Sequence, residues 1–278
     1  MPGAAQFILS GAEFSYPGSS RKILSGVDLE IRAGEWVALL GSNGSGKTTL
    51  LKILSALLAP TQGSSFICGG GSERPAANRS ARCAIVFQNP EDQIVASTLE
   101  EEAAFGPENL GCPTEEIRGR VSESLAACGL AGMETRLVSS LSGGQKQRLA
   151  LAGALAMHPA AILLDEALSM LDPQSRRAFT EIIAAEHAKG KTIVQVTHRL
   201  EEIRGAERVL MLKEGKIALD MRREDFFKMK GSELSELGLD LPPLERLCEG
   251  LKGDGLLPEG CAPEICAVEK CLNDAFGR

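Results

Sequence analysis

The chain has 278 residues, of which 44% are apolar and 24% charged, and its formal net charge is −7. This length has room for one large domain, or one domain with an appendage, around a sizeable core. The acidic balance argues against nucleic acid as a partner, because phosphate backbones recruit an excess of Lys and Arg. We expect a cytosolic protein with free thiols, since the eight cysteines need no disulfide framework in so long a chain and no signal peptide or membrane-spanning run is recognisable.

The first part of the chain alternates as strands do, in FILSGAEFSY (7–16) and SGVDLEI (25–31), with RAGE as a turn. The short apolar run WVALL (36–40) leads into a glycine-rich loop. The segment TLLKILSALLAP (49–60) then has helical spacing and stops at Pro60.

Three further short apolar runs are typical of buried parallel strands: CAIVFQ (83–88), AAILLDE (160–166) and KTIVQVTH (191–198). A helical, acidic stretch from about residue 93 to 157 precedes the second of them. This alternation predicts an α/β domain with its function at the carboxyl ends of the strands. The segment ERVLMLKEGKIALD (207–220) predicts a closing hairpin with its turn at 213–215.

From about Met221 the pattern changes to amphipathic helical segments, so we expect a domain over 1–220 and a helical appendage over 221–278. Near its end Cys261, Cys266 and Cys271 recur at every fifth residue. Metal sites usually use closer Cys pairs with further ligands, so these side chains are expected to be small apolar fillers on a helix.

The glycine-rich loop has the spacing Gly41-x-x-x-x-Gly46-Lys47-Thr48 of a phosphate-binding loop, with a strand before it and a helix after it. Its glycines let backbone N–H groups face the β-phosphate, and the helix dipole adds positive potential. Lys47 should reach the β and γ oxygens, and the Thr48 hydroxyl should bind Mg²⁺. The alternative, a flexible turn that matches by chance, does not explain the flanking strand and helix.

Two later motifs carry the remaining chemistry. The strand AILLDE delivers Asp165 near Mg²⁺, and Glu166 follows as the group that polarises the attacking water. The motif LSGGQKQR (141–148) opens a helix with a Ser-Gly-Gly turn, which is a second anion site. Two such helix starts in one chain are explained if two chains face each other head to tail, each lending its second helix start to the other's γ-phosphate.

The phosphate loop, LLDE and LSGGQ together resemble the ATP-binding cassette (ABC) ATPases over about residues 5 to 220. The resemblance implies a P-loop NTPase (RecA-like) α/β core with an antiparallel β subdomain, an α-helical signature subdomain and a small C-terminal helical extension. It also implies ATP and Mg²⁺ as ligands. Ala167 and Leu168 depart from the family's usual Pro-Thr, and Arg199 replaces a common acidic residue, but neither change removes a catalytic group.

The family pattern assigns roles to individual residues. Tyr16 would stack on adenine, unless it is a strand aromatic facing the core, and SMLD (169–172) would cross the dimer seam. The catalytic set implied is Lys47, Gln88, Glu166 and His198, and the metal set is Thr48, Gln88 and Asp165. The nucleotide-binding set is Tyr16, Gly41, Ser42, Asn43, Gly44, Ser45, Gly46, Lys47, Thr48, Thr49, Ser142, Gly143, Gly144 and Gln145.

The segment VFQNPEDQIVASTLEEEAAFGPENLG (86–111) is similar to the ATPases of energy-coupling factor transporters, which drive uptake of vitamins or of cobalt and nickel ions. In that subfamily the segment forms a groove for a helix of a transmembrane subunit, and a C-terminal extension holds two ATPases together. The implied partners are a second ATPase subunit, identical or paralogous, a transmembrane coupling subunit and a substrate-binding membrane subunit, at the cytoplasmic face of the membrane. The alternative is a soluble cassette ATPase acting on a macromolecular machine.

Overall fold

The structure is a computed structural model that describes residues 4–67, 83–229, 231–237, 239, 243–258 and 265–276. Its larger sheet has the strand order β5-β6-β7-β3-β8-β9, and every neighbouring pair is parallel except the β8–β9 hairpin. The predicted buried parallel strands and the closing hairpin are therefore confirmed. The strands are β3 (Trp36–Leu40), β5 (Cys83–Val86), β6 (Ala161–Asp165), β7 (Thr192–Val196), β8 (Arg208–Lys213) and β9 (Lys216–Arg222).

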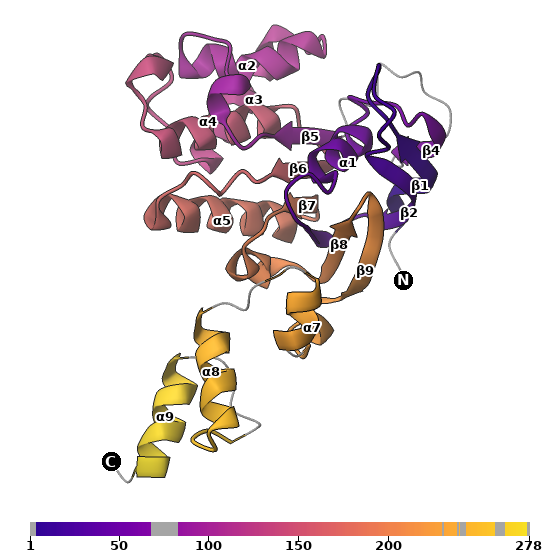
Figure 1. Cartoon of the computed structure of the whole chain (residues 1–278). Helices are drawn as coiled ribbons and strands as arrows, with labels where there is room; N and C mark the ends of the chain where they lie inside the picture. Colours follow the sequence, from indigo (N-terminus) through magenta and orange to yellow (C-terminus); the bar gives the residue numbers. More distant parts are fainter. Residues whose placement is uncertain are drawn as a thin grey trace.

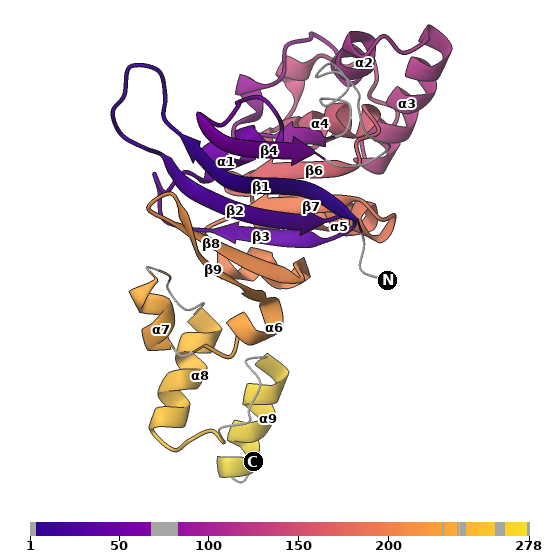
Figure 2. The ribbon, with the colours of Figure 1, turned by 90° about the vertical axis from the view of Figure 1, so that its right-hand side faces the viewer.

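A smaller antiparallel sheet lies against the larger one, as Figure 2 shows, with the order β2-β1-β4. Its strands are β1 (Ala5–Phe14), β2 (Leu24–Arg32) and β4 (Gln62–Ile67). The strand β4 was not predicted, because its sequence QGSSFI is polar and no residue in it is fully buried. Pairing with β1, from Phe7↔Ile67 to Glu13↔Gln62, makes it a strand.

The helices lie mainly on the side of the larger sheet away from the smaller one (Figure 1), except α1, which packs between the sheets. The first helix ends at Leu54 and does not continue to Pro60, because Ala56 has a left-handed backbone (φ 59°) that breaks the helical path. None of the described helices is long and apolar enough to span a bilayer. The helices are α1 (Lys47–Leu54), α2 (Leu99–Asn109), α3 (Thr114–Ala127), α4 (Gly143–Ala156), α5 (Pro173–Ala188), α6 (Arg223–Phe226), α7 (Gly231–Glu236), α8 (Pro243–Gly253) and α9 (Ile265–Phe276), with short 3₁₀ turns η3 (Pro90–Asp92), η4 (Val138–Ser140) and η5 (Leu200–Gly205).

The core is divided by the larger sheet into two apolar clusters. Successive side chains of a strand point to opposite faces, and β3 shows the result: Ala38 and Leu40 belong to the cluster beneath α2 to α5, whereas Val37 and Leu39 belong to the cluster shared with α1 and the smaller sheet. All five residues of β3 are buried. The strand that carries the phosphate loop is thus fixed from both sides.

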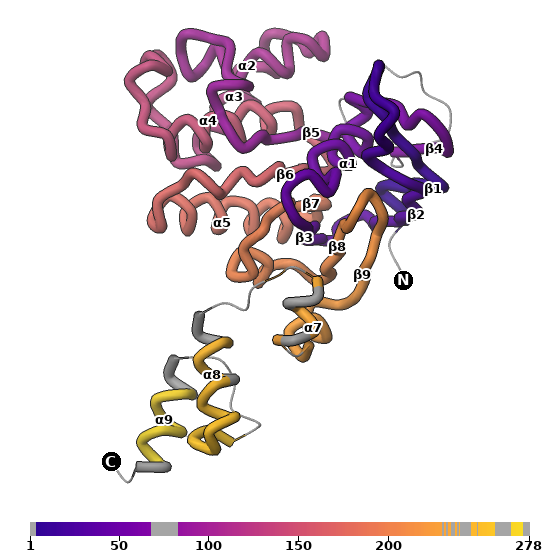
Figure 3. The backbone as a smooth tube through the Cα atoms, viewed as in Figure 1, coloured from indigo at the N-terminus to yellow at the C-terminus, as the bar shows by residue number. Residues whose placement is uncertain are grey.

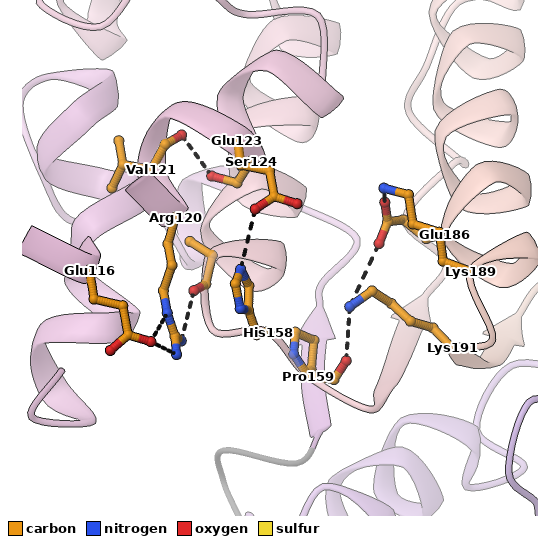
Figure 4. A network of polar contacts seen from close by, with 11 residues as sticks. Glu116, Arg120, Val121, Glu123, Ser124, His158, Pro159, Glu186, Lys189 and Lys191 are labelled. Atoms are coloured by element: carbon orange, nitrogen blue, oxygen red, sulfur yellow. Dashed lines mark hydrogen bonds and ion pairs between the residues drawn. The ribbon is translucent and has the colours of Figure 1, made fainter. Parts of the chain in front are cut away.

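Polar contacts connect the helical subdomain to the rest of the cassette at the end of α4 (Figure 4). Arg120 of α3 bonds Glu116 and the carbonyl of Ala156, and His158 lies 3.7 Å from Glu123. Beside them, the Lys191 ammonium donates to the carbonyl of Pro159 and lies 3.7 Å from Glu186 of α5. The segment after α4 therefore has contacts with α3 on one side and with α5 and the start of β7 on the other.

The C-terminal segment divides into two parts by its packing. Phe226, Leu234 and Leu239 are buried in the cluster beneath α2 to α5, so the chain just after residue 221 still belongs to the cassette's core. Helices α8 and α9 instead form a small cluster around Cys248, Leu257 and Val268, and Figures 1 and 3 show them side by side and apart from the sheets. Cys271 of α9 packs against this cluster, as expected for an apolar filler, whereas Cys261 lies outside the described residues.

Candidate functional site

The phosphate loop joins β3 to α1, and its three glycines, Gly41, Gly44 and Gly46, have a positive φ that other residues rarely adopt. A Cβ on Gly41 would lie 2.4 Å from the carbonyl oxygen of Leu212, and one on Gly46, at φ 106°, would lie 3.0 Å from that of Ile23. Inside the loop the Ser45 hydroxyl is buried and has no hydrogen-bond partner among the described residues. Gly46 is also the N-cap of α1 and supplies no capping side chain. The loop is thus a cradle of unused donors, suited to an anion.

Lys47 is the positive charge of this cradle. Its side chain is 6% exposed, and its ammonium donates to the carbonyls of Gly41 (2.8 Å) and Ser42 (3.1 Å) across the loop. The same nitrogen lies 3.7 Å from a carboxylate oxygen of Glu166. Lys47 therefore points along the loop and toward the end of β6, as the phosphate-loop motif predicts.

Thr48 and Asp165 meet at the next position, where the hydroxyl of Thr48 donates to Asp165 Oδ1 at 3.1 Å. Burial raises the pKa of Asp165 above its ordinary value. The hydrogen bond from Thr48 opposes this shift, and the neighbouring charge of Glu166 adds to it. A hydroxyl and a carboxylate in contact are the oxygen ligands that Mg²⁺ prefers, and a cation here would stabilise the buried charge.

Glu166 follows Asp165 and has a left-handed backbone, φ 50°, which is uncommon for a residue other than Gly, Asn or Asp. Its amide is held by the carbonyl of Val196, and its two carboxylate oxygens face Lys47 and His198, with His198 Nδ1 at 3.6 Å. The His198 side chain is 54% exposed. Three residues predicted from separate motifs, which follow β3, β6 and β7, thus come together at one edge of the sheet.

Gln88 lies two residues beyond the end of β5, on an exposed turn, and its amide nitrogen donates to the Ser169 hydroxyl at 3.1 Å. Ser169 begins the expected seam segment 169–172, where Met170 projects into solvent with 67% of its surface exposed. The side chains of Ala167 and Leu168, which depart from the family pattern, are buried in the core. The structure therefore connects the glutamine turn to the seam segment directly.

The signature turn lies against the first turn of its own chain's α5, because a Cβ on Gly144 would meet the Ser175 hydroxyl oxygen at 2.4 Å. Ser142 is the N-cap of α4 and forms a capping box with Gln145, whose backbone N–H bonds the Ser142 hydroxyl oxygen and whose amide oxygen accepts from Ser142 N. No hydrogen bond of the described chain joins this turn to the phosphate loop. Within one chain, the two predicted phosphate sites thus remain separate.

Tyr16 is 40% exposed and lies edge-on to Phe14, with ring centroids 5.0 Å apart. Its hydroxyl is 3.3 Å from that of Thr49 in the first turn of α1. The ring therefore lies beside the phosphate loop and is not a core aromatic.

Two glutamines that the sequence did not single out as site residues hold the backbone before Gln88. Gln93 accepts from Phe87 N at 3.1 Å and donates to the carbonyl of Ile85, while Gln147 of α4, 1% exposed, donates to the carbonyl of Phe87 at 2.9 Å. Gln93 lies in the motif QNPEDQ and Gln147 in LSGGQKQR, so membership of these motifs was the sequence feature that could have identified them as site residues. Their bonds connect the signature helix to the glutamine turn.

Comparison with known proteins agrees with this geometry. Residues 24–169 match the family model described as ABC transporter. The cobalt import ATP-binding protein CbiO of Syntrophus aciditrophicus is 44% identical over 87% of this chain and 87% of its own length. The energy-coupling factor transporter ATP-binding protein EcfA1 of Symbiobacterium thermophilum is 44% identical over 85% of this chain and 83% of its own.

Among solved structures, cbiO1 from Clostridium perfringens, part of the ABC transporter complex cbiONQ, aligns with a TM-score of 0.74 at 27% identity, over 88% of this chain and 99% of its own. The cassette MJ0796, a dimer in a post-hydrolysis state with ADP and Pi, aligns with a TM-score of 0.69 at 29% identity, over 78% and 98%. The relatives favour a transporter subunit and not a soluble machine ATPase. This chain belongs to the ABC transporter family, as an ATP-binding subunit of the energy-coupling factor type.

Proposed function

We propose that this chain is the ATP-hydrolysing motor of an energy-coupling factor transporter, powering uptake of a vitamin or transition-metal ion across the cytoplasmic membrane, on whose inner face it lies. One observation carries the catalytic part of the proposal: Lys47 and His198 converge on the two carboxylate oxygens of Glu166, at 3.7 and 3.6 Å. Glu166 directly follows Asp165, which ends β6 and accepts the hydrogen bond from Thr48 of α1. Phosphate-binding, metal-binding and water-activating groups are therefore contiguous.

The residues present fit Mg·ATP. The loop's unused N–H groups and the unpartnered Ser45 hydroxyl would bind phosphate oxygens, and Lys47 would exchange its loop carbonyls for the β and γ oxygens. Thr48, Asp165 and the amide oxygen of Gln88 would hold Mg²⁺, which when bound neutralises charge that develops on the phosphates. Tyr16 would stack on adenine beside α1.

Glu166 would orient the attacking water, and His198 would hold the γ-phosphate and keep Glu166 in place. The oxygens of a γ-phosphate facing outward need further donors, and the Ser142–Gly144 turn supplies them in a second ATPase subunit. The hydroxyl of Ser142 accepts from Gln145 N, which leaves its own proton available for such a phosphate.

The proposed surface for the transmembrane coupling subunit lies just after the glutamine turn. Val95 is 66% exposed, whereas its neighbour Ile94 is half-buried against the core, so of these two apolar residues only Val95 is presented to a partner. The chain here is fixed by Glu102, 7% exposed, whose carboxylate accepts from the backbone N–H of Val95 and of Ala96 at 2.9 Å. A rigid backbone with an exposed valine suits helix-in-groove docking.

The tail, residues 243–276, is proposed to hold the two ATPase subunits together. Its cluster buries few side chains, and Leu247 and Leu256 remain 53% and 37% exposed. An exposed leucine on α8 and another just after it form apolar surface that a second copy or a paralogue would cover favourably. A transporter of this kind also needs a substrate-binding membrane subunit, which would choose the cargo.

The test of the catalytic proposal is Glu166→Gln in the full-length chain. The change keeps size and hydrogen bonding but loses the carboxylate, so Mg·ATP turnover should fall roughly 10²-fold or more while ATP binding persists and ATP-bound dimers accumulate. Glu181→Gln, on the exposed face of α5, is the matched control and should keep its turnover. Near-normal hydrolysis by Glu166→Gln would show that another group activates the water.

A further inference from the structure

The turn that carries His198 is organised by one buried hydroxyl. Thr197, 2% exposed, donates its hydroxyl to Glu202 Oε2 at 2.6 Å, and the Thr197 hydroxyl oxygen accepts from the backbone N–H of Arg199 at 3.0 Å. The backbone of Thr197 is itself bonded to the carbonyl of Leu39 in β3. The residues on both sides of His198 are therefore tied together and to the central sheet.

Glu202 is the second member of this arrangement. Its side chain is 6% exposed, so its charge is largely removed from water. Oε2 is bonded to Thr197, whereas Oε1 is buried and has no hydrogen bond among the described residues. Two guanidinium groups compensate that oxygen at longer range: Arg176 Nε at 3.5 Å and Arg199 Nε at 3.9 Å. A buried carboxylate of this kind depends strongly on its partners.

Arg176 extends the arrangement to the seam segment. From α5 it donates to the carbonyl of Leu171 at 2.9 Å and to that of Leu168 at 3.4 Å. These two carbonyls bracket Ser169, which receives the bond from Gln88. One guanidinium thus contacts both the segment expected to face the second subunit and the carboxylate that holds the His198 turn.

We propose that Glu202 and Thr197 are positioning residues for ATP hydrolysis, which hold the His198 imidazole against Glu166 and, through Arg176, couple its position to residues 168–171, which overlap the seam segment 169–172. This inference rests on the proposed roles of Glu166 and His198. Arg199, whose basic side chain departs from the family pattern, supplies the second cation at Glu202. A displacement of the seam segment would move Arg176, change the compensation of Glu202 and so alter the His198 turn.

The experiment measures steady-state Mg·ATP hydrolysis by the full-length protein. Glu202→Gln and Thr197→Val should each lower kcat about tenfold, since each removes one positioning hydrogen bond or its charge, and leave the KM for ATP within about twofold. Thr197→Ser retains the hydroxyl and should restore turnover to within about twofold of the wild type. The matched control is Glu181→Gln, an exposed carboxylate on α5 paired with Arg177, which should behave as wild type.

A double-mutant cycle separates positioning from a purely structural role. If Glu202 acts through His198, Glu202→Gln in a His198→Ala background should lower kcat by less than about twofold further. If Glu202→Gln lowered kcat by the same factor with and without His198, the inference would be overturned. Wild-type turnover of Glu202→Gln would also overturn it, and so would a raised KM with unchanged kcat. An equal loss of kcat in Thr197→Ser and Thr197→Val would also overturn it. If Glu202→Gln does not fold, the comparison of these two Thr197 variants tests the inference.

The cycle also distinguishes this inference from the proposed function. Full activity of His198→Ala would refute the role of His198 on which the inference rests. Impaired His198→Ala together with fully active Glu202→Gln and Thr197→Val would refute the positioning residues alone. Thermal unfolding of each variant, compared with Glu181→Gln, shows whether a loss of turnover has a folding origin.

Discussion

The starts of α1 and α4 are two helix N-termini that the sequence predicts as phosphate sites, and the structure builds them differently. At α1 the N-cap is Gly46, without a capping side chain, and the first turn carries Lys47 and Thr48. At α4 the N-cap is Ser142, which shares a capping box with Gln145. Lys146, in the first turn of α4, is paired with Glu91. One site is open and charged; the other is internally bonded and neutral.

This difference implies an order of events. The α1 site contains a buried lysine and unused donors, so it should bind Mg·ATP in a single chain. The α4 site offers a helix dipole, glycine N–H groups and one hydroxyl proton. These groups bind an anion more weakly than the α1 site does, so they contribute only when the anion is already bound to another site. We therefore expect nucleotide to bind at the α1 site before the α4 turn of a second subunit closes on it.

The largest effect on this comparison is expected from Lys47→Ala. Without the ammonium the open site keeps its shape but loses its charge, so Mg·ATP hydrolysis should fall roughly 10²-fold or more and nucleotide binding should weaken. Titration with a fluorescent ATP analogue and an ATPase assay measure both. Lys228→Ala, an exposed lysine on the same protein, is the control. Unchanged binding would mean that the α1 site does not depend on its cation.

Ser142→Ala tests the other helix start and should have a smaller effect. The loss of the cap costs about 1 kcal/mol of helix stability and removes one donor from the turn. Binding of nucleotide to the single chain should not change, whereas ATP-dependent dimers of the Glu166→Gln background should dissociate at several-fold lower concentrations of denaturant or salt. Sedimentation with and without ATP measures this, with Ser122→Ala on α3 as control. Weakened nucleotide binding by the single chain would contradict the separation of the two sites.

The smallest effect concerns the metal end of the open site. Because burial raises the pKa of Asp165, the folded chain holds this proton to higher pH than the unfolded chain, whose value is near 3.8. The free energy of unfolding therefore decreases as pH rises through the window between those two pKa values. Asp165→Asn removes this penalty, so Tm without nucleotide or Mg²⁺ should rise by about 2–4 °C at neutral pH, and the gain should shrink as pH falls toward 4.

The measurement for Asp165→Asn is thermal unfolding over a pH series, with Asp254→Asn, an exposed aspartate of the tail, as control. A lower Tm for Asp165→Asn at neutral pH would show that the Thr48 hydrogen bond outweighs the cost of burial.

Much of the site could be predicted because its residues lie in contiguous motifs at strand ends. Lys47, Asp165, Glu166 and His198 each follow a buried apolar run, and parallel strands bring such ends to one edge. The network behind them could not be predicted. Thr197 and Glu202 are unremarkable polar residues in the sequence, and their bond depends on how η5 folds back after β7.

The fold departs from prediction where local pattern is weak. The strand β4 is polar and is made a strand by pairing with β1. Helix α1 stops early at a backbone conformation that periodicity does not encode. The packing of Phe226, Leu234 and Leu239 into the core likewise depends on contacts with residues distant in sequence. The domain boundary near residue 221 therefore stays a prediction. A truncation after residue 242 would keep these three residues, so it tests the tail's role better than a truncation at 221 would.

The left-handed backbone at Glu166 has an evolutionary consequence. Glycine adopts this conformation without steric cost, whereas other L-residues lose about 1–2 kcal/mol there. Random substitution at this position that yields glycine should therefore produce an inactive cassette at least as stable as the active one. Selection for folding stability would therefore not preserve Glu166. Only selection for ATP hydrolysis would act against its replacement. In a transporter with two paralogous ATPases, one copy could lose this residue by drift and remain a well-folded partner.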